Sequence, residues 1–325
     1  MRVLSGIQPS GDIHLGNYFG MMRPMINYQD RSELFVFIAN LHAMTTLTDA
    51  KALAQGTIDA AINFLALGID PEKTVFWVQS DVPEAVELTW YLSNMAPVGL
   101  LERSHSYKDK VARGIAPNAG LFFYPVLMTA DILLYDADRV PVGKDQKQHL
   151  EITRDIAIKF NNTYGETFVI PEAEIDNSVA VIPGTDGQKM SKSYNNTIEI
   201  FIEKNVLKKR VMSIVTDSIP VEEPKNPDKC NVFSLYRLFA SPDAVTDMAE
   251  RYRKGGLGYG EVKKELLDLI WNFYTPFRNR RDELLNDKAA VRKILLEGAD
   301  KARYYATKTM RKVRKKVGST YFKDK

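Results

Sequence analysis

Cysteine is almost absent from this 325-residue chain, and long apolar runs are absent altogether. The single cysteine, Cys230, excludes an intrachain disulfide and any metal site built from several cysteines, and it favours a reducing compartment. No apolar run is long enough to span a bilayer, and the sequence enters a short apolar run at once, without the features of a secretory leader. We therefore expect a cytoplasmic protein without a membrane partner.

Net charge is also small, at +3, so a nucleic-acid partner would have to bind a local basic patch rather than a general positive field. Residues 301–325 form one such patch, with ten lysines and arginines against one acidic residue. This asymmetry suits an RNA phosphate backbone, and a solvated helix end explains it as well. With 45% hydrophobic and 26% charged residues, the chain has the balance of a globular protein, and its length favours two domains.

Short apolar runs alternate with amphipathic segments in the first half of the chain. Four of these runs predict strands: residues 2–4, 34–39, 74–78 and 140–142. Helices are predicted between them, at 17–28 with a kink or early stop at Pro24, and from Asp49 to about residue 65. This alternation predicts an α/β fold with a Rossmann-like parallel sheet.

Two later segments change the pattern. Residues 83–135 are mostly helical in character and predict a helical insertion in the sheet domain, whereas residues 165–188 are expected to be irregular. Beyond Ser193 the composition shifts to helix formers and charge. Helices are predicted there at 207–214, 232–239, 244–254, 260–285 with an interruption at Pro276, and 288–316. We predict a Rossmann-like catalytic domain over 1–195 and a C-terminal α-helical domain over 196–325.

Residues 5–18, SGIQPSGDIHLGNY, compress a strand end, a tight turn and a helix start into few positions. Glycines at Gly11 and Gly16 would let a ligand approach the backbone, and free N–H groups at the new helix end attract phosphate. His14 adds a donor at the same place. Taken alone, such a stretch is often only a turn.

Residues 187–193, GQKMSKS, set Lys189 and Lys192 three positions apart among small hydroxyl residues. Two ammonium groups in this arrangement can embrace a polyphosphate. As a lone basic loop, the segment would be solvated surface.

Two further residues stand where a substrate is expected. His42 directly follows the strand predicted at 34–39, and ligands of doubly wound sheets lie outside the carboxyl ends of strands, although a histidine that caps a turn fits equally. Asp131 lies inside the apolar run 128–135, where a charge is costly unless it is paired or binds something.

Together the two motifs resemble the paired signatures of class I aminoacyl-tRNA synthetases. His14-Leu15-Gly16-Asn17 stands for the family's His-Ile-Gly-His and departs from it at Asn17, whereas residues 189–193 match Lys-Met-Ser-Lys-Ser completely. The surroundings of the first motif resemble the tryptophanyl branch in its bacterial form. Residues 143–146 resemble that branch's Gly-Glu-Asp-Gln element, with Lys144 where glutamate is more usual.

The resemblance implies a ligase that activates tryptophan with ATP and transfers it to tRNA(Trp), releasing AMP and pyrophosphate. It further implies a homodimer formed through the insertion at 83–135, and tRNA anticodon binding by the helices of 196–325. Magnesium would arrive with ATP, and no protein metal site is expected. Two alternatives stay open: a tyrosyl-tRNA synthetase of the same class, and a catalytically silent RNA-binding relative.

The resemblance also assigns site residues. Catalytic roles fall on Gln8, His14, Lys189 and Lys192. ATP binding falls on Gln8, Pro9, Ser10, Gly16, Asn17, Gly143, Lys144, Asp145, Val181, Lys189, Met190, Ser191, Lys192 and Ser193. Tryptophan binding falls on His42, Tyr124, Met128, Asp131 and Gln146.

Asp131 is expected to read the indole ring. Its neighbours Met128, Ile132 and Leu133 are apolar, and tryptophan's ring offers an N–H donor that a carboxylate accepts. The alternative is that Asp131 caps a helix or pairs with Arg139.

Overall fold

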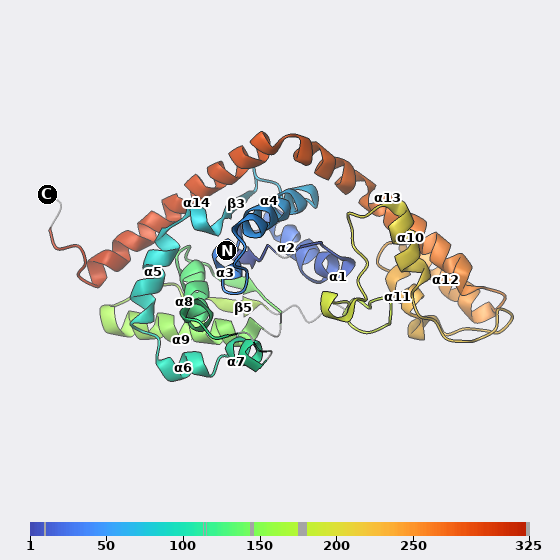
Figure 1. Cartoon of the computed structure of the whole chain (residues 1–325), viewed down its shortest axis with the longest axis horizontal. Helices are drawn as coiled ribbons and strands as arrows, with labels where there is room; N and C mark the ends of the chain where they lie inside the picture. Colours follow the sequence, from blue (N-terminus) through green and yellow to red (C-terminus); the bar gives the residue numbers. More distant parts are fainter. Residues whose placement is uncertain (10, 113, 115, 144–145, 175–180, 323–325) are drawn as a thin grey trace. The chain divides into compact units, whose positions relative to one another are not determined.

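The computed structural model describes residues 1–9, 11–112, 114, 116–143, 146–174 and 181–322, leaving aside the side chains of residues 105, 106, 109 and 110. The chain divides into two compact units (Figure 1). The sheet unit consists of Met1–Gly11, Met25–Asp176 and Leu284–Lys325. The helical unit consists of Asp12–Pro24 and Asn177–Glu283. The units therefore interleave along the chain, and the predicted functional division at residue 196 stays a prediction.

A parallel sheet forms the centre of the sheet unit, in the strand order β3-β2-β1-β4-β5 among the described residues (Figure 1). The strands are β1 (Arg2–Ile7), β2 (Glu33–Ile38), β3 (Thr74–Val78), β4 (Arg139–Pro141) and β5 (Glu172–Glu174). The chain moves outward from β1 to β3 and then crosses to β4, so the order reverses between β1 and β4. The register aligns Ile7, Ile38 and Val78 at one edge. The predicted α/β class with a parallel sheet is confirmed.

The prediction of an irregular segment over 165–188 was wrong at β5. This strand has only three residues, two of them glutamates, and among the described residues its one paired strand is β4. So short and charged a segment carries no strand pattern of its own. Its conformation is therefore set by the neighbouring strand, which the local sequence does not encode.

Helices surround this sheet. They are α3 (Asn40–Ala43), α4 (Ala50–Ala66), α5 (Glu84–Ser93), α6 (Val98–Glu102), α7 (His105–Ala112), α8 (Ala119–Leu133), α9 (Lys147–Tyr164) and α14 (Lys288–Lys316). The helices α5 to α8 make up the predicted helical insertion; α8 packs against both α5 and α9 (Figure 1). Asp49 caps α4 and Asn118 caps α8 through their side-chain oxygens.

The last helix, α14, packs against β3. Gly298 lies so close to the backbone carbonyl of Phe76 that no Cβ fits between them. Ala299, Ala302 and Ala306 continue this small-residue face and are buried in the core of the sheet unit. Small side chains here let a helix backbone approach a strand edge closely, which explains why the end of the chain belongs to this unit.

The helical unit holds α1 (Leu15–Asn17), a π-helical turn η1 (Tyr18–Met22), α10 (Lys204–Met212), η6 (Pro227–Lys229), α11 (Asn231–Tyr236), α12 (Pro242–Lys254) and most of α13 (Tyr259–Asn286). Aromatic rings fill its core. Tyr18 meets Phe19 and Tyr274 edge to face, with ring centroids 5.1 and 5.4 Å apart, and Phe239 meets Phe273 in the same way at 5.3 Å. The opening helix thereby packs against α13 within one unit.

Two prolines behave differently from each other. The helix predicted at 17–28 is divided into α1, η1, α2 (Arg23–Ile26) and a 3₁₀ turn, η2 (Asn27–Asp30). Pro24, which cannot donate to the preceding turn, is the second residue of α2, just after the π turn. Pro276, predicted to interrupt the helix at 260–285, lies inside an unbroken α13. In that turn the side chains of Thr275 and Arg278 both donate to the carbonyl of Trp271, whereas the carbonyl that loses its helical donor is that of Asn272, four residues before Pro276.

Candidate functional site

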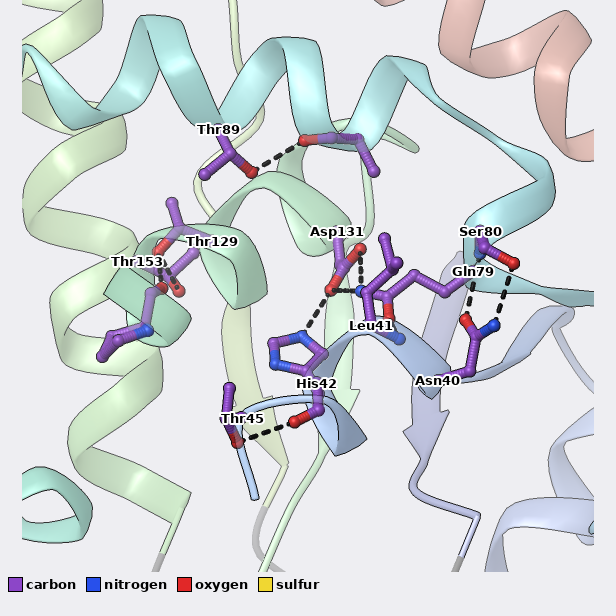
Figure 2. Close-up of polar contacts among 12 residues, drawn as sticks. Asn40, Leu41, His42, Thr45, Gln79, Ser80, Thr89, Thr129, Asp131 and Thr153 are labelled. Atoms are coloured by element: carbon purple, nitrogen blue, oxygen red, sulfur yellow. Dashed lines mark hydrogen bonds and ion pairs between the residues drawn. The ribbon is translucent and has the colours of Figure 1, made fainter. Parts of the chain in front are cut away.

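In the sheet unit, three polar side chains meet beyond the carboxyl ends of β2 and β3 (Figure 2). Asp131 of α8 lies 2.8 Å from Nε2 of His42 on α3, measured to its Oδ2. Gln79, the first residue after β3, donates its Nε2 to both carboxylate oxygens at 2.9 and 2.7 Å. Asp131 is 2% exposed and Gln79 is 1% exposed. The charge predicted to need a partner is thus buried and hydrogen-bonded.

The orientation of Gln79 is fixed from its other end. The backbone N–H of Leu41 donates to Gln79 Oε1 at 3.1 Å, so the amide nitrogen faces Asp131. Next to it, Asn40 and Ser80 exchange two hydrogen bonds of 2.9 and 3.1 Å, which tie α3 to the turn η3 (Gln79–Asp81). The carboxylate is therefore held by a rigid frame rather than by one flexible partner.

Arg139, considered above as a partner of Asp131, instead forms an ion pair with Glu172 at 2.7 Å. In the described part of the chain the recorded partners of Asp131 are His42 and Gln79. The arginine alternative for Asp131 is therefore not realised in this structure.

The helix α8 presents Tyr124, Met128 and Asp131 on one face, since they are spaced by four and three residues. The Tyr124 hydroxyl lies 2.8 Å from Nε2 of His149, a buried residue of α9, and its ring meets that of His42 edge to face at 6.3 Å. Gln146 occupies the N-cap position of α9, three residues before His149. The structure thus brings the predicted tryptophan-binding residues onto α3, α8 and the start of α9.

The ends of β1 and β4 carry the next group of predicted residues. Gln8 is exposed directly after β1, with the buried Pro9 behind it, and Gly143 is exposed shortly after β4. The Gly143 carbonyl accepts the backbone N–H of Gln146 at 2.9 Å and so leads into α9. Because β1 and β4 are neighbours where the strand order reverses, this edge has the usual geometry of a ligand crevice. The predicted residues Ser10, Lys144 and Asp145 lie outside the described residues.

In the helical unit, the two signature motifs are in direct contact. The segment after residues 187–193, here called the lysine loop, pairs antiparallel with the first motif, residues 5–18. Leu15 N–H donates to Ile198 O at 3.0 Å, and Ile200 N–H donates to Ile13 O at 2.9 Å. In addition, Gly16 N–H donates to the Sδ of Met190 at 3.3 Å. Segments almost two hundred residues apart in sequence therefore form one structure.

His14 caps the short helix α1. Its Nδ1 accepts the backbone N–H of Asn17 at 3.3 Å, and the Asn17 side chain accepts the backbone N–H of His14 at 3.2 Å. Burial, with a smaller effect of the Lys192 charge and opposition from Glu199, lowers the pKa of His14 to about 4. His14 is therefore neutral near pH 7. With Nδ1 accepting, its proton lies on Nε2, which becomes a neutral donor.

Asn17, the departure from the family pattern, has a local explanation. Its side chain completes the capping box of α1, so it acts on the helix start.

The lysine loop is a tight hairpin. Met190 N–H donates to Ile182 O at 2.9 Å, and Gly184 N–H donates to Gln188 O at 2.7 Å. Met190 is buried, whereas Lys189 and Lys192 are exposed, the latter at the start of the 3₁₀ turn η5 (Lys192–Tyr194).

The hydroxyls of Ser191 and Ser193 lie 2.9 Å apart on this loop, and Val181 is exposed one residue before the hairpin. The loop thus combines a buried methionine anchor with ammonium and hydroxyl groups in solvent, a donor set that suits polyphosphate.

Two polar residues that hold these groups were missed in the sequence. Gln79 follows β3 as His42 follows β2, so the rule that pointed to His42 applies to Gln79 as well. Asn196 is buried behind the lysine loop and bonded to it, and no pattern in the sequence singles it out.

Neither a metal cluster nor a membrane span is found in the part of the chain that the structure describes. No group of three or more histidine, cysteine, aspartate or glutamate side chains there could hold a metal ion. No helix in that part is both long enough and apolar enough to cross a bilayer.

Comparison with known proteins gives concordant results. A family profile described as tRNA synthetases class I (W and Y) matches residues 1–275. The tryptophan–tRNA ligase of Campylobacter jejuni strain RM1221 is 53% identical over 318 residues, which span 98% of this chain and 100% of that protein. The Fusobacterium nucleatum tryptophan–tRNA ligase is 54% identical, covering 98% of both chains. A crystal structure of C. jejuni tryptophanyl-tRNA synthetase complexed with ADP and tryptophan superposes with a TM-score of 0.94 over 98% of this chain and 100% of that one.

Proposed function

The chain belongs to the class I tRNA synthetases of the tryptophan and tyrosine group, and on that premise we propose that it activates tryptophan with ATP and charges tRNA(Trp). In the first step the tryptophan carboxylate attacks the α-phosphorus of ATP and pyrophosphate leaves. In the second step a hydroxyl of the terminal ribose of the tRNA attacks the aminoacyl carbonyl and AMP leaves. Tryptophan is favoured over tyrosine because relatives at 53% and 54% identity across nearly the whole chain are tryptophan–tRNA ligases.

The observation that carries this proposal is the contact between the two signature motifs within the helical unit. In-line phosphoryl chemistry needs groups that position the reactants and neutralise charge rather than a nucleophilic side chain. His14 offers a neutral Nε2–H donor, and the adjoining loop offers Lys189 and Lys192. We assign His14 to the phosphates in the ground state and the lysines to the leaving pyrophosphate. Mg²⁺ is proposed to arrive bound to ATP.

The tryptophan side of the reaction is assigned to the sheet unit. Asp131 is proposed to accept the indole N–H, since a carboxylate has about four lone-pair sites and its recorded protein partners hold it in place. Tyr124 and Gln146 are proposed to bind the amino acid's charged groups. His42, predicted to share that task, is hydrogen-bonded to Asp131, and we propose that it contributes by holding that carboxylate in position.

The nucleoside end of ATP is assigned to the edge where β1 and β4 end, with Gln8, Pro9 and Gly143. The roles of Ser10, Lys144 and Asp145 stay predictions. So does the adenine contact of Val181, whose exposed side chain leaves room for a ligand.

The tRNA is proposed to contact the exposed face of α14. A hollow of about 510 Å³ on this helix is lined by Asp300, Arg303, Tyr304, Thr307, Lys308 and Arg311. Cations that flank an exposed tyrosine ring suit phosphates and an unstacked base. This surface lies within the basic segment noted in the sequence and supports the proposal, and anticodon binding by the helices of 196–325 stays a proposal beside it.

A homodimer is proposed to form through the insertion at 83–135. Trp90 is 71% exposed on α5, with Val86 one turn before it, and Val98 is exposed at the start of α6. Neighbouring large apolar side chains in solvent are typical of an interface between subunits. The cytoplasm, where tRNA charging takes place, is proposed as the compartment.

Exchange of labelled pyrophosphate into ATP, measured with each amino acid in turn, tests the function. We expect exchange to depend on tryptophan, and charging of tRNA(Trp) to follow. Preferential exchange with tyrosine would establish the tyrosyl alternative. Absence of exchange with every amino acid, in a folded protein that still binds tRNA, would establish a silent relative.

A further inference from the structure

Asn196 lies directly behind the lysine loop and is only 2% exposed. Its Oδ1 accepts the backbone N–H of Ser191 at 2.8 Å. Its Nδ2 donates to Asp186 Oδ1 at 2.7 Å and to the carbonyl of Lys189 at 3.1 Å. One amide group therefore binds the loop at three points.

These three bonds fix the turn on both sides of Met190. Lys189 and Ser191 flank this methionine, whose sulfur accepts the N–H of Gly16. The backbone of Asn196 also accepts the N–H of Thr185 at 2.9 Å, which extends the hold to the entry of the hairpin. A displacement of the Asn196 amide would therefore shift the loop and its contact with the first motif together.

The packing around the amide is equally specific. A Cβ added at Gly184 would overlap the Asn196 amide, so the hairpin backbone lies directly against it. An asparagine has one acceptor oxygen and two N–H donors, and all three capacities are used here. No isosteric residue reproduces this set: aspartate keeps the acceptor, but it would set oxygen against oxygen at Asp186 and at Lys189.

We propose that Asn196 is a positioning residue for adenylate formation, which holds the backbone that carries Lys189 and Lys192 in the geometry needed by the leaving pyrophosphate. This inference rests on the proposed function. Both lysines extend from this backbone, so the position of their ammonium groups depends in part on how firmly it is held. Loss of the three hydrogen bonds of the Asn196 side chain, here called the clamp, should therefore impair ATP binding and adenylate formation and leave tryptophan binding intact.

The test compares the Asn196→Asp variant with the wild-type protein in tryptophan-dependent ATP–pyrophosphate exchange. Small displacements of positioned groups cost on the order of 10²-fold in rate, so we expect kcat to fall by about that factor, with a raised KM for ATP and an unchanged KM for tryptophan. Should this variant fail to fold, Asp186→Ala removes one of the same bonds at an exposed position, and a smaller change in the same direction is expected.

Asn161→Asp is the matched control. In the sheet unit, Asn161 donates to the carbonyl of Phe168 at 2.9 Å and accepts the N–H groups of Thr167 and Phe168, each at 3.0 Å. It is thus a loop clamp of the same kind away from the lysine loop. We expect a lower melting temperature with unchanged kinetic constants.

A second measurement uses the double variant that combines Asn196→Asp with Lys192→Ala. If Asn196 acts by placing Lys192, the combined loss should be clearly smaller than the product of the two single losses. The inference is overturned if a folded Asn196→Asp protein keeps wild-type exchange, if the KM values for ATP and tryptophan rise equally, or if the two losses multiply. Absence of exchange in the wild-type protein would instead refute the proposed function.

Discussion

Replacement of Asp131 by asparagine should abolish most of the preference for tryptophan. The substitution keeps the side-chain volume at a position that is 2% exposed, so it opens no cavity. It replaces an ionised acceptor by a neutral amide. Hydrogen bonds to charged groups contribute about 1.5–3 kcal/mol, which corresponds to a roughly 10- to 160-fold loss in kcat/KM for tryptophan. Phenylalanine has no N–H to lose, so its kcat/KM should change little.

The same substitution will also change stability, because the structure ties the carboxylate to two buried partners. If the amide oxygen of the Asp131→Asn variant keeps the bonds to His42 and Gln79, its NH2 group faces the Nε2 donor of Gln79, and a buried donor left without an acceptor costs about 1–3 kcal/mol. A fall in the melting temperature alone is therefore uninformative. The decisive quantity is the ratio of kcat/KM for tryptophan over phenylalanine, measured by pyrophosphate exchange at a temperature where both proteins are folded.

Thr129→Val supplies the matched control on the same helix. The Thr129 hydroxyl is buried 3.1 Å from that of Thr153, so the variant loses a buried hydrogen bond of α8 at nearly constant volume. It should melt at a lower temperature with the tryptophan preference retained. If Asp131→Asn behaves in the same way, with stability reduced and the ratio unchanged, the carboxylate serves the fold and the indole assignment is wrong.

Four further outcomes are expected. Lys192→Ala should raise the activation free energy of adenylate formation by about 2–4 kcal/mol with little effect on tryptophan binding. Equal effects on the rate of adenylate formation and on tryptophan affinity in single-turnover kinetics would contradict the pyrophosphate assignment. The pKa of His14 is lowered from 6.5 to about 4, so on acidification the unfolded chain protonates this histidine before the folded chain does. The free energy of unfolding should therefore fall by up to about 3 kcal/mol as the pH falls from 6.5 to about 4. Urea denaturation of His14→Gln should show a smaller loss. Trp90→Glu should give monomers in sedimentation at micromolar concentration, and a wild-type monomer would refute the dimer. Joint replacement of Lys308 and Arg311 by glutamine should weaken tRNA binding and lower its salt dependence, while amino acid activation stays unchanged.

Much of the fold follows from local patterns in the sequence. Residues 34–39 and 74–78 are continuous apolar runs, and such runs are stable only between two covered faces, so they predicted β2 and β3 closely. The helix predicted at 288–316 has the observed bounds of α14. The lysine loop was found for a different reason, since two lysines three positions apart among hydroxyl residues have the chemistry of a polyphosphate site. In each case the information lies within a few adjacent residues.

Tertiary structure alone decided the remaining features. The strand β5 exists through its pairing with β4, and α13 continues through Pro276 although a proline at that position favours an interruption. Asp131 was recognised as a charge in an apolar run, but its partners come from the ends of two separate strands. The clamp of Asn196 on the lysine loop likewise needs the folded hairpin. Local sequence encodes which groups must be buried or bonded, whereas the identity of their partners depends on contacts that only chain folding creates.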